Sequence, residues 1–289
     1  MNNMTAMVCA FVKAYHNEKN NLKIYKDNYS RKIISDEEYD LISSNMKNGI
    51  KFFNPNYDGD NPLEWIVNNR LAPSVLARSI FNEKHLNNEI KLGLKQYVIL
   101  GSGYDMSGYK VNNILSVFEL DKDDVVKDKM NRVSRANINN ENIKYIGCDF
   151  NEDWIIKLIN SGFDSNTKSY FSMLGLSYYL EKDIFKNTIK TISSIMSEGS
   201  TILFDYPNND ESETEILNQK LAERANSEMK SKYSCGDIER ICEECSLLIY
   251  ENIGYKEINQ EYFNLYNSLN PNNKILASKG VSYCLLVKK

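Results

Sequence analysis

An apolar run that breaks into a glycine turn, followed by a second apolar run that carries an acid near its end, constrains this chain more than any other feature. The first run is Gln96–Leu100 and leads into Gly101-x-Gly103; the second is Leu115–Leu120 and contains Glu119. In a parallel sheet, such glycines let a ligand approach the backbone where a strand ends, and the acid can bind ribose hydroxyls. The pattern predicts a nucleotide-type pocket.

Strand and helix patterns alternate from residue 96 onward, as in βαβ units. Further strands are expected over Ile143–Gly147, Ser169–Leu174 and Thr201–Phe204, and helices over 121–133, 153–160, 181–196, 211–231 and 235–247. Two late apolar runs, Gly254–Leu265 and Val281–Val287, predict a closing hairpin with its connection around Asn270-Pro271-Asn272-Asn273. We therefore expect an α/β fold whose open sheet is mostly parallel and has one reversed strand.

Residues 1–95 differ from the rest because their pattern is mainly helical. We interpret them as an N-terminal helical cap on one domain that spans 1–289, with residues 96–289 as its core. The segment 51–62 is loop-like and carries the aromatic residues Phe52, Phe53 and Tyr57. A cap over the strand ends would bury a cofactor and shape a substrate cavity.

Composition excludes several classes of function. The net charge of -4 argues against a nucleic-acid partner. No apolar stretch approaches the ~20 residues that span a bilayer, and the first residues lack the apolar core of a secretory signal. Six scattered cysteines in a long chain indicate reduced thiols and a cytoplasmic protein. Cys242-x-x-Cys245 with Cys235 raises a zinc hypothesis, but a helix with ordinary cysteines is favoured, so no metal is expected.

The turn itself discriminates between ligands. A dinucleotide fingerprint needs a third glycine where this chain has Met106, and a P-loop needs a Gly-Lys-Ser/Thr that is missing here. A cofactor without phosphates, S-adenosylmethionine, fits better. Glu119 can then bind the ribose diol, and Asp149 can accept from the adenine amino group with Phe150 beside it. An NAD-dependent oxidoreductase remains an alternative.

These residues resemble a family. Arg78, then Gln96-Tyr-Val-Ile-Leu-Gly-Ser-Gly-Tyr-Asp105 and Val117-Phe-Glu-Leu-Asp121, look like the leucine carboxyl methyltransferase family and its bacterial relatives. Later landmarks match as well: Asp149, Gly162-Phe-Asp164, Gly175 with Tyr179-Leu180, and Gly199-Ser200 with Asp205-Tyr206. The resemblance implies a class I methyltransferase-like (Rossmann-like) fold with a seven-stranded sheet. It also implies S-adenosylmethionine as the cofactor and S-adenosylhomocysteine (SAH) as a product.

The resemblance also implies roles for single residues. Arg78 stands where the family's arginine binds the methionine carboxylate of the cofactor, and Lys13 stands where a second cation assists it. Asp105 matches the acid of the glycine turn. Two positions depart from the family: Leu174 replaces an acid, and Met106-Ser107 replaces Thr-Arg. A reshaped acceptor pocket or a weakened cofactor site would follow.

Methyl transfer from a sulfonium needs mainly the positioning of donor and acceptor in a dry cavity. We expect an O-methyltransferase that acts on a carboxylate or hydroxyl of a small molecule, or on a protein C-terminus. Tyr178, Tyr179 and Asp205 are the candidates for lining the acceptor site. Leu174 and the missing arginine leave a second hypothesis, a catalytically idle cofactor-binding or interaction protein on the same fold. The sequence does not predict an oligomeric state.

Overall fold

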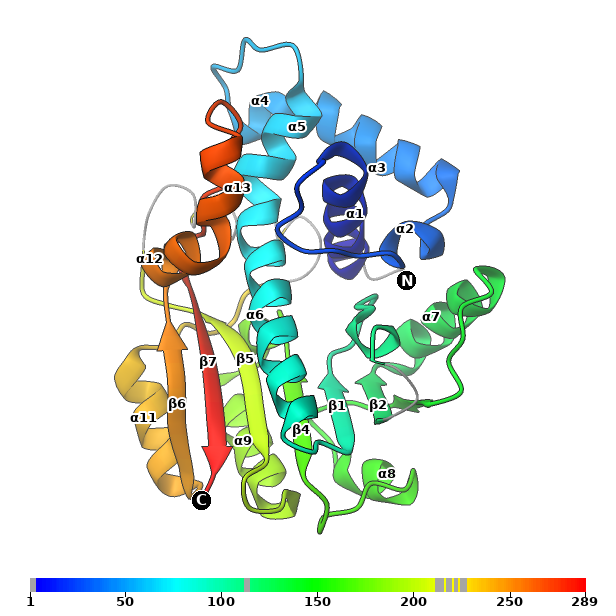
Figure 1. Ribbon diagram of the computed structural model, residues 1–289, viewed down its shortest axis with the longest axis vertical. Helices are drawn as coiled ribbons and strands as arrows, with labels where there is room; N and C mark the ends of the chain where they lie inside the picture. Colours follow the sequence, from blue (N-terminus) through cyan, green and yellow to red (C-terminus); the bar gives the residue numbers. More distant parts are fainter. Residues whose placement is uncertain (1–3, 112–114, 211–215, 217–219, 221–222, 224–227) are drawn as a thin grey trace.

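The computed structural model describes residues 4–111, 115–210, 216, 220, 223 and 228–289. Seven strands form one sheet in the order β3-β2-β1-β4-β5-β7-β6 (Figure 1). Their bounds are β1 Gln96–Leu100, β2 Ser116–Asp121, β3 Ile143–Gly147, β4 Ser169–Met173, β5 Thr201–Pro207, β6 Leu247–Ile253 and β7 Val281–Lys288. The strands β1 to β5 are parallel, and β7 runs antiparallel to both β5 and β6. The predicted fold class, with one antiparallel strand, is confirmed.

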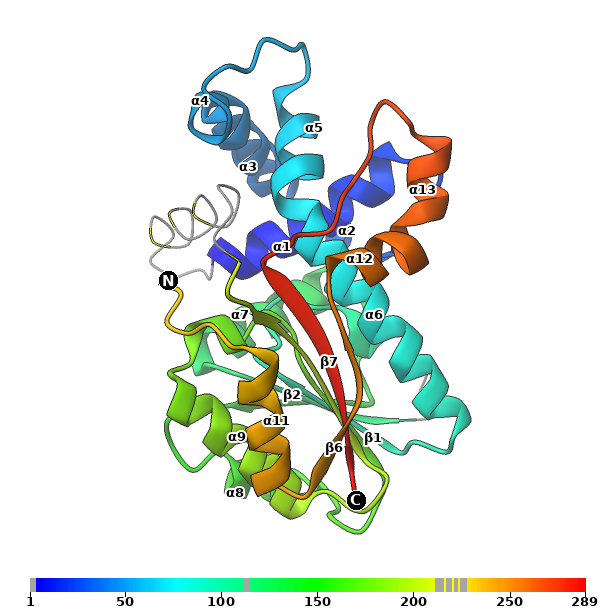
Figure 2. The ribbon, with the colours of Figure 1, turned by 90° about the vertical axis from the view of Figure 1, so that its left-hand side faces the viewer.

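Helices cover both faces of the sheet, and more lie beyond its carboxyl edge (Figures 1 and 2). The N-terminal helices are α1 Met4–Lys19, α2 Ser30–Ile33, α3 Asp36–Asn48, α4 Ile50–Phe53, α5 Pro62–Ile66, the π-helical turn η1 Val67–Leu71 and α6 Ala72–Lys91. Those that follow β1 are η2 Ser107–Tyr109, α7 Asp123–Arg135, α8 Ile155–Asn160, η3 Ser177–Tyr179, α9 Lys182–Ile195, α11 Cys235–Glu244, α12 Tyr255–Ile258, η4 Asn259–Phe263 and α13 Asn264–Leu269. None of the described helices is long and apolar enough to cross a membrane.

The central strands separate two apolar cores because they are buried on both faces, as parallel strands usually are. In β1, Tyr97 and Ile99 face a core shared with α6 and the N-terminal helices. Val98 and Leu100 face the other core, which α8, α9 and α11 complete. Figure 2 shows α9 and α11 on one side of the sheet and α6 on the other. Alternate residues of β1 therefore face opposite sides of the sheet.

The predicted cap is helical in the structure, because residues 4–95 contain helices and no strand. Helix α3 begins at a capping box, in which Glu38 N–H donates to Ser35 Oγ and Ser35 N–H donates to the Glu38 carboxylate. Arg132 of α7 then pairs with the same carboxylate at 2.6 and 2.7 Å and donates to Ile33 O at 3.0 Å. Arg132 therefore links the N-terminal helices to α7, which packs on the sheet. The grouping of cap and core into one domain stays a prediction.

The prediction of a strand over Gly254–Leu265 is wrong. The sixth strand is β6, Leu247–Ile253, and Gly254 instead starts a helix whose Glu257 accepts the Gly254 N–H at 3.0 Å. The apolar residues there recur at helical spacing, and Ile258 and Phe263 are fully buried against the cap. The strand was missed because the helix expected over 235–247 ends at Glu244, where Ser246 takes a positive φ of 53°.

Consequently β6 and β7 pair directly but are not joined by a short turn. Residues 254–280 connect them and contain α12, η4 and α13. The expected helix over 211–231 lies largely outside the described residues.

Candidate functional site

The turn after β1 lies where the strands β1 and β2 end. Gly101 and Gly103 have φ values of +65° and +45°, which side chains with a Cβ rarely adopt. Ser102 N–H donates to Leu120 O at 3.0 Å, and Gly103 N–H donates to Asp121 Oδ2 at 2.7 Å. The turn is thus bonded to the end of β2 by its backbone amides.

The two glycines also provide space that any larger residue would fill. A Cβ on Gly103 would lie 2.9 Å from the Ala6 Cβ of α1, and one on Gly101 would lie 3.0 Å from Leu176 Cδ1. Helix α1 and the segment after β4 therefore pack directly on the turn. That Gly101 and Gly103 also hold the cofactor stays a prediction.

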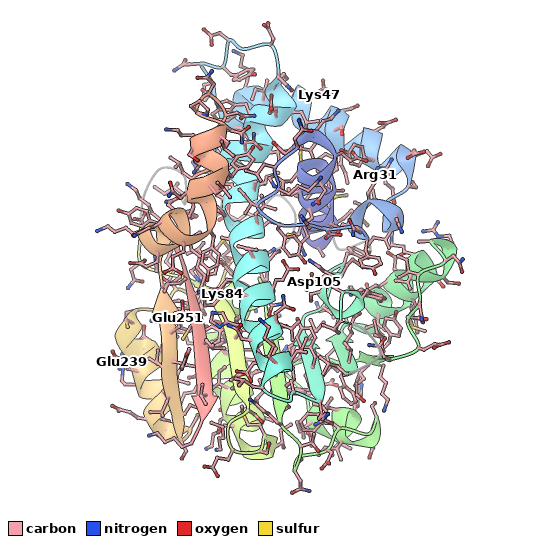
Figure 3. All side chains as sticks on the ribbon, viewed as in Figure 1. Arg31, Lys47, Lys84, Asp105, Glu239 and Glu251 are labelled. Carbon is pink, nitrogen blue, oxygen red and sulfur yellow. The ribbon has the colours of Figure 1, made fainter. Side chains whose placement is uncertain are left out.

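Asp105 connects the turn to the cap (Figure 3). Lys13 Nζ of α1 donates to its Oδ1 at 2.7 Å, and Ser107 Oγ donates to its Oδ2 at 2.7 Å. Burial would raise the pKa of Asp105, but the ammonium groups of Lys13 and Lys129 and the Ser107 hydroxyl hold it below the ordinary value. Asp105 is therefore a stable anion that holds Lys13 over the turn.

A second cation, Arg78 of α6, lies at the carboxyl end of β4. Its Nη2 donates to Cys9 Sγ of α1 at 2.9 Å, and its Nη1 lies 3.6 Å from Asp205 Oδ2. Burial would lower the pKa of Arg78, but the neighbouring Cys9 and Asp205 raise it, so the guanidinium keeps its charge. A Cβ on Gly175 would lie 2.4 Å from Nη1. Gly175 thus makes room for the guanidinium.

The three acceptor-site candidates lie close to Arg78, but two of them are already engaged. The Asp205 carboxylate is fully buried; its Oδ1 accepts the Gly175 N–H at 2.6 Å and its Oδ2 accepts the Tyr178 hydroxyl at 3.1 Å. Tyr179 is half-buried, and burial raises the pKa of its hydroxyl to about 12. Tyr179 is the most accessible of the three.

Glu119 lies two residues inside β2 and is fully buried. Its Oε2 pairs at 2.7 Å with Nζ of Lys129, which is also fully buried. Burial raises the pKa of Glu119, and Lys129 opposes this shift. The next residue on the same face of β2 is Asp121, which was not among the sequence-based candidates; it ends the strand and accepts the Gly103 N–H. An acid at the last position of the strand was the available signal.

Asp149 and Phe150 follow β3 at the same edge of the sheet. Asp149 Oδ1 accepts from the backbone and side-chain nitrogens of Asn151 at 2.9 and 2.7 Å, and these bonds lower the pKa of Asp149. Phe150 packs edge-on against Trp154, with ring centroids 5.8 Å apart. Leu174 follows β4 and packs, half-buried, on the core that faces the cap. Sequence reasoning placed all three at strand ends, and they lie there.

The geometry thus combines a glycine cradle, two cations from α1 and α6, and carboxylates at the ends of β2 and β3. Residues 6–193 match the family described as leucine carboxyl methyltransferase. The chain belongs to this family. It is an S-adenosylmethionine-dependent methyltransferase, and S-adenosylmethionine is its cofactor. The resemblance of the glycine turn and the two strand ends to this family is confirmed.

Similar proteins support the same assignment to S-adenosylmethionine-dependent methyltransferases. The chain is 32% identical over 303 residues to YktD of Bacillus subtilis (strain 168), which is provisionally named an S-adenosyl-L-methionine-dependent methyltransferase; the match covers 99% of this chain and 98% of YktD. A similarly named protein of Mycolicibacterium gilvum is 25% identical over 156 residues, which is 53% of this chain and 51% of that relative. The chain thus matches about half the length of that second relative.

Among solved structures, the crystal structure of magnesium protoporphyrin IX methyltransferase (ChlM) from Synechocystis PCC 6803 with bound SAH superposes with a TM-score of 0.51. It is 8% identical, and the match covers 86% of this chain and 99% of ChlM. At this identity the likeness concerns the fold alone.

The residues present fit S-adenosylmethionine. Lys13 and Arg78 supply positive charge for an amino-acid carboxylate, and the glycines supply a surface without Cβ atoms. Glu119 Oε1 is a buried acceptor that makes no hydrogen bond within the described part of the chain. When bound, the cofactor supplies an electrophilic methyl group on a sulfonium. No group of three or more potential metal ligands gathers anywhere in the described residues.

Proposed function

We propose that this methyltransferase transfers the methyl group to an oxygen, and that the acceptor is a carboxylate of a small molecule or of a peptide C-terminus. The observation that carries this proposal is the state of Asp205. Asp205 is fully buried beside Arg78, and its oxygens already accept from Gly175 N–H and from Tyr178, so it is poorly placed to act as a base toward a hydroxyl acceptor. A carboxylate, with a pKa near ~4, is already ionised at neutral pH and needs no base.

The proposed cofactor contacts divide among the elements around the turn. Arg78 and Lys13 bind the methionine carboxylate, because a guanidinium and an ammonium from two helices both lie at this edge. Gly101 and Gly103 bring the backbone against the cofactor, and Asp105 holds Lys13 in place. Leu174 lies where the methionine part of the cofactor would pass.

The carboxylates at the strand ends and the Phe150 ring bind the nucleoside part of the cofactor in this proposal. Asp149 accepts from the adenine amino group, and Phe150 packs beside the base. For the ribose diol we propose Asp121 in place of the candidate expected from the sequence, Glu119, which pairs with Lys129. Asp121 ends β2 and retains 9% exposure, whereas Glu119 has none. Burial raises the pKa of Asp121, as expected for an acid in a closed site.

Calorimetric titration with S-adenosylmethionine and SAH tests the binding site. We expect the wild type to bind both ligands, and Arg78→Met to weaken binding at least tenfold. Arg240→Met on the exposed face of α11 is the matched control and should bind as the wild type does. No binding by the wild type at millimolar ligand would overturn the proposed site.

A methyl-transfer assay tests the acceptor. Purified protein is incubated with radiolabelled cofactor and with panels of carboxylic acids, peptides that end in a free carboxylate, and alcohols. We expect base-labile methyl esters from one of the first two panels, and a lower kcat for Tyr179→Ala with this acceptor. Transfer to alcohols alone would contradict a carboxylate acceptor. Release of SAH with any acceptor would refute the hypothesis of an idle binding protein.

A further inference from the structure

The buried ion pair between α7 and β2 lies beneath the cofactor turn. Lys129 and Glu119 both have fully buried side chains, and Lys129 Nζ lies 2.7 Å from Glu119 Oε2. The same Nζ donates to the backbone carbonyl of Asp105 at 2.5 Å. We propose that Lys129 is a positioning residue for the turn 101–105 and that Glu119 acts on the cofactor through Lys129. This inference rests on the proposed cofactor site.

The turn gains a fixed position because its last residue is held from two sides. Lys13 binds the Asp105 carboxylate from the cap, while Lys129 binds the Asp105 carbonyl from the sheet layer. The Ser107 hydroxyl, which also binds Asp105, contacts the Tyr97 hydroxyl on β1 at 3.0 Å. The backbone of the turn is thereby connected to α1, α7 and β1 at once. A cofactor that binds to backbone amides gains from such preorganisation.

A buried lysine without an anion would be costly, and Glu119 supplies that anion. Taking both charges out of water contributes little net stability, so the pair is better explained by what it holds than by the energy it gives. The Tyr109 ring completes the enclosure, with its centroid 5.5 Å from Lys129 Nζ. Gly108 packs against the other oxygen, since a Cβ there would lie 3.3 Å from Glu119 Oε1.

Direct contact between Glu119 and the ribose is the competing arrangement, because Oε1 makes no hydrogen bond with the described residues. A thermodynamic cycle distinguishes direct contact with the ribose from an effect through Lys129. SAH and its 2′,3′-dideoxyribose analogue are titrated into the wild type and into Glu119→Gln, with binding measured by calorimetry. If Glu119 acts through Lys129, the substitution weakens both ligands by the same factor. If it binds the diol, the loss disappears with the analogue, and the inference is overturned.

The role of Lys129 is tested with a double variant, so that no buried charge is left without its partner. The double variant Glu119→Leu, Lys129→Met removes the whole pair, and thermal denaturation followed by circular dichroism identifies a temperature at which it is folded. There we expect SAH to bind at least tenfold more weakly than to the wild type, with faster amide hydrogen exchange in the turn 101–105. Lys127→Met, on the exposed side of the same helix, is the matched control and should change neither quantity.

Two outcomes contradict the inference in different ways. A folded double variant that binds SAH as the wild type does would show that the pair does not position the turn. A wild type that binds neither ligand would overturn the proposed cofactor site, and the inference would fall with it.

Discussion

The Lys13 ammonium lies 2.7 Å from the Asp105 carboxylate and so joins the N-terminal helix to the turn that follows the first strand. Both side chains are largely buried, with exposures of 6% and 16%, which keeps the interaction from being screened by solvent. In the proposed site, helix α1 therefore contributes contacts to the cofactor turn and does not only cover it. The same helix brings Cys9 to Arg78 and Ala6 to Gly103.

Lys13→Met should weaken SAH binding by about tenfold, or about 1.4 kcal/mol. The substitution removes a cation from the proposed carboxylate site and also frees Asp105 from α1. Calorimetric titration measures the change. Lys19→Met, at the exposed end of the same helix, is the control, and equal affinities for the two variants would remove Lys13 from the site.

Gly175→Ala should disturb cofactor binding, whereas Gly199→Ala should not. Both glycines have positive φ, +69° and +73°, so both substitutions cost about 1–2 kcal/mol of stability through backbone strain. Only at Gly175 would the new Cβ meet a functional group, 2.4 Å from Arg78 Nη1, while nothing lies within 4 Å at Gly199. Measuring both the SAH affinity and the unfolding midpoint of each variant distinguishes the displacement of Arg78 from backbone strain. A similar affinity loss in both variants would mean that strain alone matters.

Arg132→Met should destabilise the fold by about 2 kcal/mol, because it leaves carboxylates without their partner. The Arg132 side chain is 3% exposed and pairs with Glu38 of the cap and with Asp128. Chemical denaturation measures the loss. Arg135→Met, three residues on and exposed, should stay within about 0.5 kcal/mol of the wild type. A wild-type midpoint for Arg132→Met would show that the cap is fastened elsewhere.

Acid should destabilise the protein partly through His16. Burial lowers the pKa of His16 from 6.5 to about 4, and its Nε2 accepts the Ile24 N–H at 3.0 Å. Between these pH values the unfolded chain binds a proton that the folded chain refuses, so the free energy of unfolding falls as the pH falls. His16→Gln should reduce this slope between pH 6.5 and about 4. Parallel curves for the two proteins would contradict the assignment.

Much of the sheet could be predicted because local signals were strong. The apolar runs at β1 to β5 lie between turn residues, and parallel strands buried on both faces leave just such runs. The late region could not be predicted as well. Tyr255, Ile258 and Tyr262 recur at the i, i+3, i+7 spacing of a helix, a periodicity that the sequence-based prediction of a strand missed.

The candidate site likewise contains residues that could be predicted from the sequence and residues that could not. Residues at strand ends, such as Gly103 and Asp149, could be identified because chain order fixes where parallel strands end. Lys129 could not, since nothing in a helix of charged residues distinguishes the one lysine that turns inward. The choice of Glu119 over Asp121 had a similar origin. Both acids face the same side of β2, and only the three-dimensional arrangement shows that Lys129 pairs with the first of them.

The long connection between β6 and β7 has a consequence for how the protein is made. Asn273 bonds to Glu64 at 2.6 Å and to Asn68 at 2.7 Å, and Tyr266 bonds to Asn20 at 2.8 Å. These partners are separated by 205 to 246 residues of sequence. A ribosome releases the cap first, but the cap receives these contacts only when the last tenth of the chain emerges. Until then the cap lacks these partners, so we expect it to reach its final packing only at the end of synthesis.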